Sequence, residues 1–154
     1  MNNDVQVLLV EDDASLKRSL KKYLERAGYT YHGCSTAREA LALAERLIPD
    51  IVIAEYHLPD ANGVSLLEKL KRMVPEVAAI LLSEYDFDAV SKDLVHVAVR
   101  SFLKKPFDLV EFEAALSSAR WKMKSTSVES VEGEQRSGPE GMPVSISKQG
   151  TLRG

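Results

Sequence analysis

The sequence predicts an α/β domain in which helices cover both faces of a parallel sheet. Short apolar runs alternate five times with longer amphipathic stretches. The clearest run, residues 77–82, is apolar throughout, which is typical of a strand that is buried on both faces. Strands that are separated by helices pair in parallel through right-handed crossovers, so these two observations together indicate the fold class.

Five apolar runs are the predicted strands. The first begins at Val5 and is followed directly by Glu11 and Asp12. The third is rich in β-branched residues and has the acidic side chain of Glu55 at its end. The fifth is short and amphipathic, and it is followed by Lys105. The predicted strands cover residues 5–10, 29–35, 50–55, 77–83 and 101–104.

The helix boundaries follow from capping and turn residues. Ser15 or Asp13 is expected to cap the first helix, and Gly28 to end it in the C′ position. Thr36 is the expected cap of the second helix, and Asp108 that of the last. The fourth helix has the weakest pattern of the five. The predicted helices cover residues 14–27, 37–48, 63–74, 86–99 and 109–124.

The bulk composition limits the function classes. A net charge of −3 gives no general attraction to nucleic acid or to an anionic membrane. Cys34 is the single cysteine, which excludes an internal disulfide and favours a reducing compartment. The sequence has no signal-peptide pattern at its start, and no apolar run reaches the roughly 18 residues of a spanning helix. We expect a cytoplasmic protein that binds neither nucleic acid nor membrane directly.

The composition changes after Lys124. Residues 125–154 contain Ser, Thr, Gly, Glu and Gln with two prolines and no sustained apolar period. Such a segment buries too little apolar surface to offset the entropy of ordering its chain. We therefore expect one domain over residues 1–124 and a disordered tail or linker over residues 125–154, with a docking peptide as the alternative.

Acidic, hydroxyl and basic side chains occur where the predicted strands end. The carboxyl ends of parallel strands lie at one edge of the sheet, so Glu11, Asp12, Glu55, Ser83 and Lys105 should come together there. Adjacent carboxylates suit a hard cation such as Mg²⁺. A hydroxyl and an ammonium group are suited to holding the oxygens of a phosphoryl group. The set therefore predicts a site of the kind used in phosphoryl transfer.

Five short segments occur in a specific order and spacing: Leu-Val-Glu-Asp-Asp at 9–13, Pro-Asp-Ile-Val at 49–52, Leu-Pro with a glycine at 58–63, Ile-Leu-Leu-Ser at 80–83 and Phe-Leu-Lys-Lys-Pro-Phe at 102–107. Through them the chain from Val5 to about Lys124 resembles the receiver domain of two-component response regulators. The resemblance implies a flavodoxin-like, doubly wound sheet of five parallel strands in the order 2-1-3-4-5, with five helices. It also implies a signalling domain and not an enzyme.

The resemblance implies an acceptor and a metal site at the strand ends. Glu55 occupies the position of the phosphoacceptor. Glu11, Asp12, Glu55 and the backbone carbonyl of His57 would hold Mg²⁺, with Asp12 as a direct ligand and Glu11 acting through water.

The resemblance also implies a switch. Ser83 would be the hydroxyl that moves toward a phosphoryl group, and Phe102 the aromatic residue whose rotamer follows it. Lys105 would pair with the phosphoryl oxygens, and Pro106 would set the turn that directs it, often through a cis bond.

The acceptor position departs from the family pattern. Receivers have an aspartate four residues before the loop proline, and counting back from Pro59 gives Glu55. Asp50 lies at the start of the strand and Asp60 lies past the proline, so no shift of register restores an aspartate. The extra methylene carries the carboxylate about 1.5 Å farther, which is large for phosphoryl transfer. Glu84, where receivers usually have a small residue, is a second departure.

We expect Glu55 to imitate a phosphorylated acceptor, with its oxygens bonded by Lys105 and Ser83 and with weakened Mg²⁺ binding. The domain would then act independently of phosphorylation through its fourth helix, fifth strand and fifth helix, over residues 86–122. That face is expected to bind a histidine kinase or another signalling protein, or to form a homodimer.

Four alternatives remain open at this point. The first is a functional phosphoacceptor that receives its phosphate from a histidine kinase with Mg²⁺. The second is that Glu55 has drifted in a domain kept for its surface. The third is a small-molecule binder on the same fold, although no glycine-rich phosphate loop follows the first strand. The fourth is one piece of a longer hybrid kinase or regulator.

Overall fold

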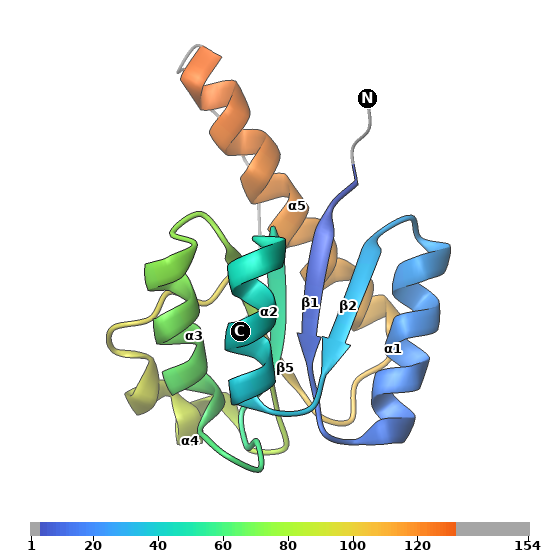
Figure 1. Ribbon diagram of the computed structural model, residues 1–154, viewed down its shortest axis with the longest axis vertical. Helices are drawn as coiled ribbons and strands as arrows, with labels where there is room; N and C mark the ends of the chain where they lie inside the picture. Colours follow the sequence, from blue (N-terminus) through green and yellow to red (C-terminus); the bar gives the residue numbers. More distant parts are fainter. Residues whose placement is uncertain (1–3, 132–154) are drawn as a thin grey trace. The chain divides into compact units, whose positions relative to one another are not determined.

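The computed structural model describes residues 4–131, and the side chains of residues 4–120. Within them, all strands belong to one parallel sheet of order β2-β1-β3-β4-β5, as predicted (Figure 1). By its internal contacts the chain divides into Met1–Arg120 and Trp121–Gly154, and the sheet belongs to the first unit. The strands are β1 (Gln6–Val10), β2 (Thr30–Cys34), β3 (Ile51–Glu55), β4 (Ala78–Ser83) and β5 (Ser101–Lys104).

The helices begin at the expected capping residues. Asp13, and not Ser15, caps the first helix by accepting a hydrogen bond from the N–H of Leu16 at 3.0 Å. Thr36 accepts one from Glu39 at 3.1 Å at the start of the second helix. The helices are α1 (Ala14–Arg26), α2 (Ala37–Leu47), α3 (Gly63–Met73), α4 (Phe87–Val90), the 3₁₀-helix η1 (Ser91–Leu94) and α5 (Leu109–Val131).

The prediction of a fourth helix over residues 86–99 is wrong in length. Regular structure there consists of α4 and η1, four residues each. The segment is rich in valine and aspartate, which lose rotamer freedom or compete for backbone hydrogen bonds in a helix. Buried Val90 and Val97 hold it to the core. The segment is therefore a short, weakly helical connection.

The last helix ends later than predicted. It was expected to end near Lys124, and α5 ends at Val131. The extra residues include serine and threonine but neither glycine nor proline, and the next glycine is Gly133. The rest of the expected tail, residues 132–154, lies outside the described residues.

The core lies on both faces of the sheet. Leu8, Val52 and Leu81 of the central strands pack with Ala40 of α2 and Leu67 of α3 in one buried cluster. Figure 1 shows α2 and α3 in front of the sheet. Side chains alternate along a strand, so the same strands also present a second apolar face.

Helices α1 and α5 meet on that second face. The rings of Tyr23 on α1 and Phe112 on α5 pack edge to face with centroids 5.6 Å apart, and Phe112 is fully buried. The double covering explains why the central strands are apolar throughout. Within the described residues, no helix is long and apolar enough to cross a membrane.

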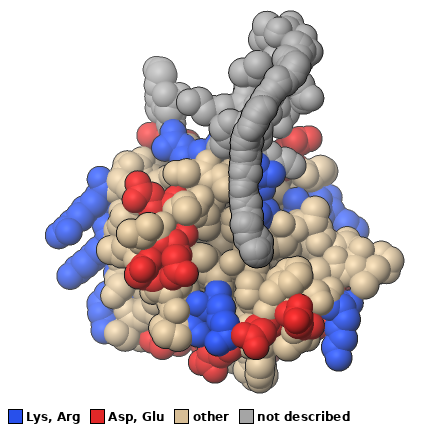
Figure 2. Space-filling view, turned by 180° about the vertical axis from the view of Figure 1, so that it is seen from behind, with Lys and Arg blue, Asp and Glu red and all other residues tan. Residues whose placement is uncertain are grey.

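At the surface, charged side chains of both signs are interspersed. On the face seen from behind, Lys and Arg lie beside Asp and Glu, and neither sign covers the visible part (Figure 2). This distribution agrees with the small net charge of −3.

Candidate functional site

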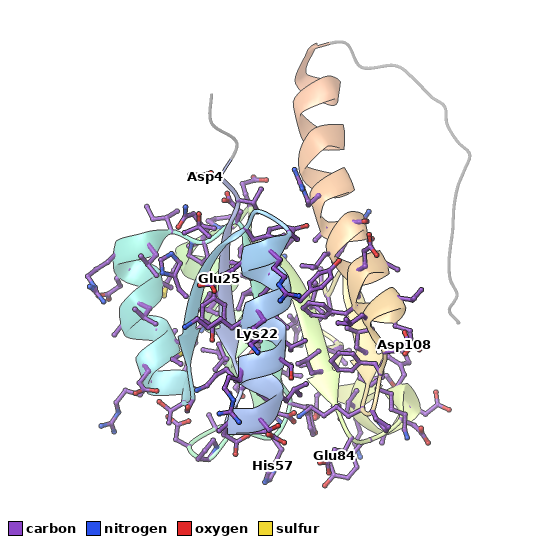
Figure 3. All side chains as sticks on the ribbon, turned by 90° about the vertical axis from the view of Figure 1, so that its right-hand side faces the viewer. Asp4, Lys22, Glu25, His57, Glu84 and Asp108 are labelled. Carbon is purple, nitrogen blue, oxygen red and sulfur yellow. The ribbon has the colours of Figure 1, made fainter. Side chains whose placement is uncertain are left out.

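The carboxyl ends of the strands bring the predicted site residues to one edge of the sheet. Glu11 follows β1 directly, and Glu55 is the last residue of β3. Glu55 is paired in register with Leu82 of β4, and Ser83 with Lys104 of β5. The lower edge in Figure 1 is this edge. Figure 3 shows His57 and Glu84 at the same end, both pointing away from the sheet.

Lys105 bridges two buried glutamates at this edge. Its Nζ lies 2.5 Å from Oε1 of Glu55 and 2.9 Å from Oε1 of Glu11. The side chains of Glu11 and Glu55 are 0% and 6% exposed, and that of Lys105 is 15% exposed. At such distances the attraction between opposite charges is strong, and it offsets the free energy that burying these charges costs. One ammonium group is thus shared by two carboxylates.

The remaining carboxylate oxygens accept backbone hydrogen bonds. Oε2 of Glu55 accepts one from the N–H of His57 at 2.7 Å. Oε2 of Glu11 accepts one from the N–H of Asp13 at 3.0 Å. Each glutamate therefore has one oxygen on Lys105 and the other on the loop that follows its strand, which fixes both side chains.

The charges of this group are set by burial and pairing. Burial raises the pKa of Glu11, although Lys105 and the N–H of Asp13 act in the opposite direction. Burial also works against the charge of Lys105, but its contacts with Glu55 and Glu11 outweigh burial, so the pKa of Lys105 is raised. Lys105 is consequently a permanent cation at neutral pH.

Ser83 lies in the site but does not bond Glu55. Its side chain is fully buried, and Oγ accepts a hydrogen bond from the N–H of Tyr85 at 2.8 Å. Within the described residues it makes no hydrogen bond to the Glu55 carboxylate, so the expected contact is absent. The hydroxyl is held instead by the turn that follows β4.

Phe102 lies on β5, and Pro106 lies just beyond the end of this strand. The half-buried Phe102 ring packs edge to face on Phe87 of α4, with centroids 5.4 Å apart. The Lys105–Pro106 peptide bond is cis, as the resemblance implies. Phe102 thereby links β5 to α4.

Glu84 lies next to Lys105 on the solvent-exposed side of the site. It is exposed, and no ion pair or hydrogen bond engages its carboxylate within the described residues. It lines a pocket of about 520 Å³ together with Asp13, Leu16, Lys105, Pro106 and Phe107. The pocket thus has a carboxylate beside the exposed part of the Lys105 side chain.

The two aspartates near the acceptor position have other partners. Oδ1 and Oδ2 of Asp60 accept hydrogen bonds from Ala37 and Arg38 at 2.8 and 3.0 Å, at the N-terminus of α2. Oδ2 of Asp50 accepts one from Gln6 at 2.8 Å, at the start of the sheet. Neither aspartate is available in place of Glu55.

The arrangement of strands and site residues agrees with a family comparison. Residues 7–117 match the response regulator receiver domain. The chain belongs to this family. Receiver domains act in two-component signalling, and typically as signalling modules without enzyme activity that interact with histidine kinases and other signalling proteins.

Relatives of this receiver domain occur in several kinds of protein. It is 34% identical to sensor kinase CckA of Brucella abortus over 71% of this chain and 12% of that protein. It is 30% identical to chemotaxis protein CheY of Thermotoga maritima over 66% of this chain and 86% of that protein. The chain spans 61% of the photosynthetic apparatus regulatory protein RegA of Cereibacter sphaeroides and 27% of a protein-glutamate methylesterase of Treponema pallidum.

Solved receiver structures share the fold. The signal receiver domain of a LuxO repressor protein from Vibrio parahaemolyticus is 26% identical, with a TM-score of 0.74 over 86% of this chain and all of that chain. A CheY-like receiver from Methanospirillum hungatei is 26% identical, with a TM-score of 0.73 over 82% of this chain and 99% of that chain.

The receiver's acidic residues do not fit a divalent cation in this arrangement. Glu11 and Glu55 have all four oxygens committed to Lys105 or to backbone N–H groups. Asp12 and His57 are exposed, and within the described residues neither the Asp12 carboxylate nor the His57 carbonyl accepts a hydrogen bond. The described residues contain no group of three acidic, histidine or cysteine side chains placed to hold a metal. Lys105 instead supplies the positive charge that pairs with the two glutamates.

The sequence patterns missed two contacts that shape the site. A Cβ on Gly63 would lie 2.2 Å from the carbonyl oxygen of Glu55, so α3 begins against the end of β3. The hydroxyl of Tyr56 donates a hydrogen bond to Oδ2 of Asp93 in η1 at 2.5 Å. The asparagine–glycine pair at 62–63 signalled a turn, but nothing in the sequence pairs Tyr56 with a residue 37 positions away.

Proposed function

We propose that this receiver domain signals without phosphorylation, because the Glu55 carboxylate takes the place of a phosphoryl group. The supporting observation is the 2.5 Å ion pair between Glu55 Oε1 and Lys105 Nζ. Lys105 is the residue to which the family resemblance assigns the phosphoryl oxygens. A carboxylate supplies one negative charge where a phosphoryl group supplies nearly two. The mimic therefore biases the conformational switch only in part.

Three features argue against phosphoryl transfer to Glu55. Its two oxygens are engaged by Lys105 and by the N–H of His57. Its carboxylate stands about one carbon–carbon bond, roughly 1.5 Å, farther from the backbone than that of an aspartate. The exposed carboxylate of Glu84, beside the pocket at Lys105, would repel an incoming phosphoryl group. Mg²⁺ binding should be weak because the oxygens of Glu55 are engaged and its carboxylate is displaced from the position that an aspartate would give it.

The proposed output surface consists of α4, β5 and α5, over residues 86–122. Phe87 and Val95 are 49% and 71% exposed there, and both are large apolar residues. Phe102 of β5 packs on Phe87, so a change at the site end of β5 reaches this surface. The surface would dock a histidine kinase, another signalling protein or a second copy of the domain.

Incubation with acetyl phosphate and Mg²⁺, followed by intact-mass measurement, tests the proposal. The wild-type protein should gain no phosphoryl group. The E55D/E84A double variant replaces the two glutamates that depart from the family pattern at the site and serves as the positive control, which should be phosphorylated. Phosphorylation of the wild-type protein at Glu55 would overturn the proposal in favour of a functional phosphoacceptor.

A further inference from the structure

A side-chain hydrogen bond joins the residue that follows β3 to η1. Oη of Tyr56 donates to Oδ2 of Asp93 at 2.5 Å, between residues 37 positions apart. Both side chains are half-buried, and the acceptor is a carboxylate, which makes this a charge-assisted bond. Tyr56 is the residue directly after Glu55. The bond therefore connects the candidate site to the α4–η1 segment.

The backbone of Tyr56 is fixed on both sides. Its N–H donates to the carbonyl of Leu82 at 2.7 Å, and its own carbonyl accepts from Gly63 at 2.6 Å. The next N–H, that of His57, donates to Oε2 of Glu55 at 2.7 Å. The Glu55 carboxylate thus holds the peptide group on the C-terminal side of Tyr56. A change in that carboxylate would therefore shift the backbone that carries the Tyr56 ring.

The Tyr56 ring also contacts the turn after β4. It packs edge to face with Tyr85 at a centroid distance of 5.9 Å. The N–H of Tyr85 donates to Oγ of Ser83, the predicted switch residue. Tyr56 therefore contacts the turn that follows β4 as well as η1, which lies within the proposed output surface.

The helices of the α4–η1 segment are short and lack side-chain caps. Both of its helices are four residues long, and neither has a side-chain hydrogen bond at its N-cap. Short helices without caps depend on tertiary contacts for their stability. The charged hydrogen bond to Asp93 therefore restrains η1 together with the core contacts of Val90, Leu94 and Val97.

We propose that Tyr56 is a positioning residue that transmits the state of the Glu55–Lys105 pair to η1 through its hydrogen bond to Asp93. Loss or rearrangement of the pair shifts the Tyr56–His57 peptide, loosens the bond to Asp93 and releases η1 next to the exposed Val95. The inference rests on the proposed function of Glu55, since it describes how a change at that residue alters the conformation of the output surface.

Amide hydrogen exchange of residues 87–97 in the full chain tests the bond itself. Tyr56→Phe keeps the ring and removes the hydroxyl, so exchange in this segment should become at least about tenfold faster. Amides of β1 and β3 should keep their wild-type rates. Tyr85→Phe is the matched control, because the Tyr85 hydroxyl has no hydrogen-bond partner within the described residues, and it should leave the segment unchanged.

A double variant tests the pairing. Asp93→Ala should accelerate exchange as Tyr56→Phe does, and combining the two should add less than about a further twofold if they remove the same bond. Unchanged exchange in Tyr56→Phe, or fully additive effects in the double variant, would overturn the proposal.

The transmission step is tested with Glu55→Gln in two backgrounds. This change should alter exchange in residues 87–97 in the wild-type background, and should have no added effect in the Tyr56→Phe background. Equal effects in both backgrounds would overturn transmission through Tyr56 but leave the proposed function of Glu55 intact. No change anywhere over residues 83–104 in the wild-type background would overturn both.

Discussion

Gly63 lies so close to Glu55 that a Cβ at residue 63 would stand 2.2 Å from the carbonyl oxygen of Glu55. Its N–H donates a 2.6 Å hydrogen bond to the carbonyl of the next residue, Tyr56. The start of α3 is thereby fixed to the last residues of β3. The position of the Glu55 backbone depends on the absence of a side chain at residue 63.

Gly63→Ala should lower the free energy of unfolding by about 2 kcal/mol, because the clash is with backbone atoms that cannot rotate away. Gly28→Ala is the comparison: residue 28 has a φ of +94° and nothing within 4 Å of an added Cβ. Its cost, about 1 kcal/mol, comes from backbone conformation alone. Urea unfolding measures both, and a smaller loss in Gly63→Ala than in Gly28→Ala would contradict the close approach.

Lys105→Met should destabilise the protein by about 3 kcal/mol or more at neutral pH, because it leaves two buried carboxylates without a cation. Lys104→Met is the matched control on the neighbouring residue. Lys104 is half exposed and lies 3.7 Å from the exposed Asp86, so its loss should cost less than about 1 kcal/mol. Chemical denaturation at pH 7 distinguishes the two, and equal losses would argue against the shared ion pair.

Glu11 should make stability depend on pH in a defined direction. Its folded-state pKa is raised above the usual 4.5, so protonation favours the folded state. The stability that Glu11 contributes is fully present below pH 4.5 and is lost as the pH rises through the raised value. The difference in unfolding free energy between wild type and Glu11→Gln should therefore fall from pH 4 to pH 8. A difference that rises over this range would refute the assignment.

Asp60→Ala should release the N-terminus of α2. The Asp60 carboxylate accepts hydrogen bonds from Ala37 and Arg38, and the first of these is the main cause that lowers the pKa of Asp60. Amide exchange of residues 37 and 38 should therefore accelerate in the variant. In the wild type the contribution of Asp60 is present above pH 3.8 and is lost as the pH falls through its lowered pKa. Retained protection in Asp60→Ala would show that Thr36 suffices as the cap.

The sheet was predictable because its strands are buried on both faces. All six residues of β4 are buried, and only the last of them, Ser83, is polar. The apolar periodicity gave a wrong helix length where the sequence has a weak helical pattern. Residues 86–99 were predicted as one helix, and α4 and η1 replaced it because valine and aspartate disfavour a long one.

The residues that form the site could be predicted from the sequence, but the hydrogen bonds they make could not. Strand-end residues converge by topology alone, which brought Glu11 and Glu55 to Lys105. The partner of Ser83 depends on side-chain rotation and on the turn at Tyr85, which strand patterns do not encode. The Tyr56–Asp93 bond joins a strand end to a segment that has no periodic signal of its own.

One ammonium group held between two buried carboxylates has a consequence for how this sequence can evolve. The charges of residues 11, 55 and 105 compensate one another. A change at any one of them therefore alters the free energy of burying the other two charges. Aspartate at position 55 would withdraw the carboxylate from Lys105 and leave the lysine to Glu11. A return to aspartate at position 55 would therefore change the charge balance of Glu11 and Lys105 as well, and the present state of the domain depends on these neighbours as much as on Glu55 itself.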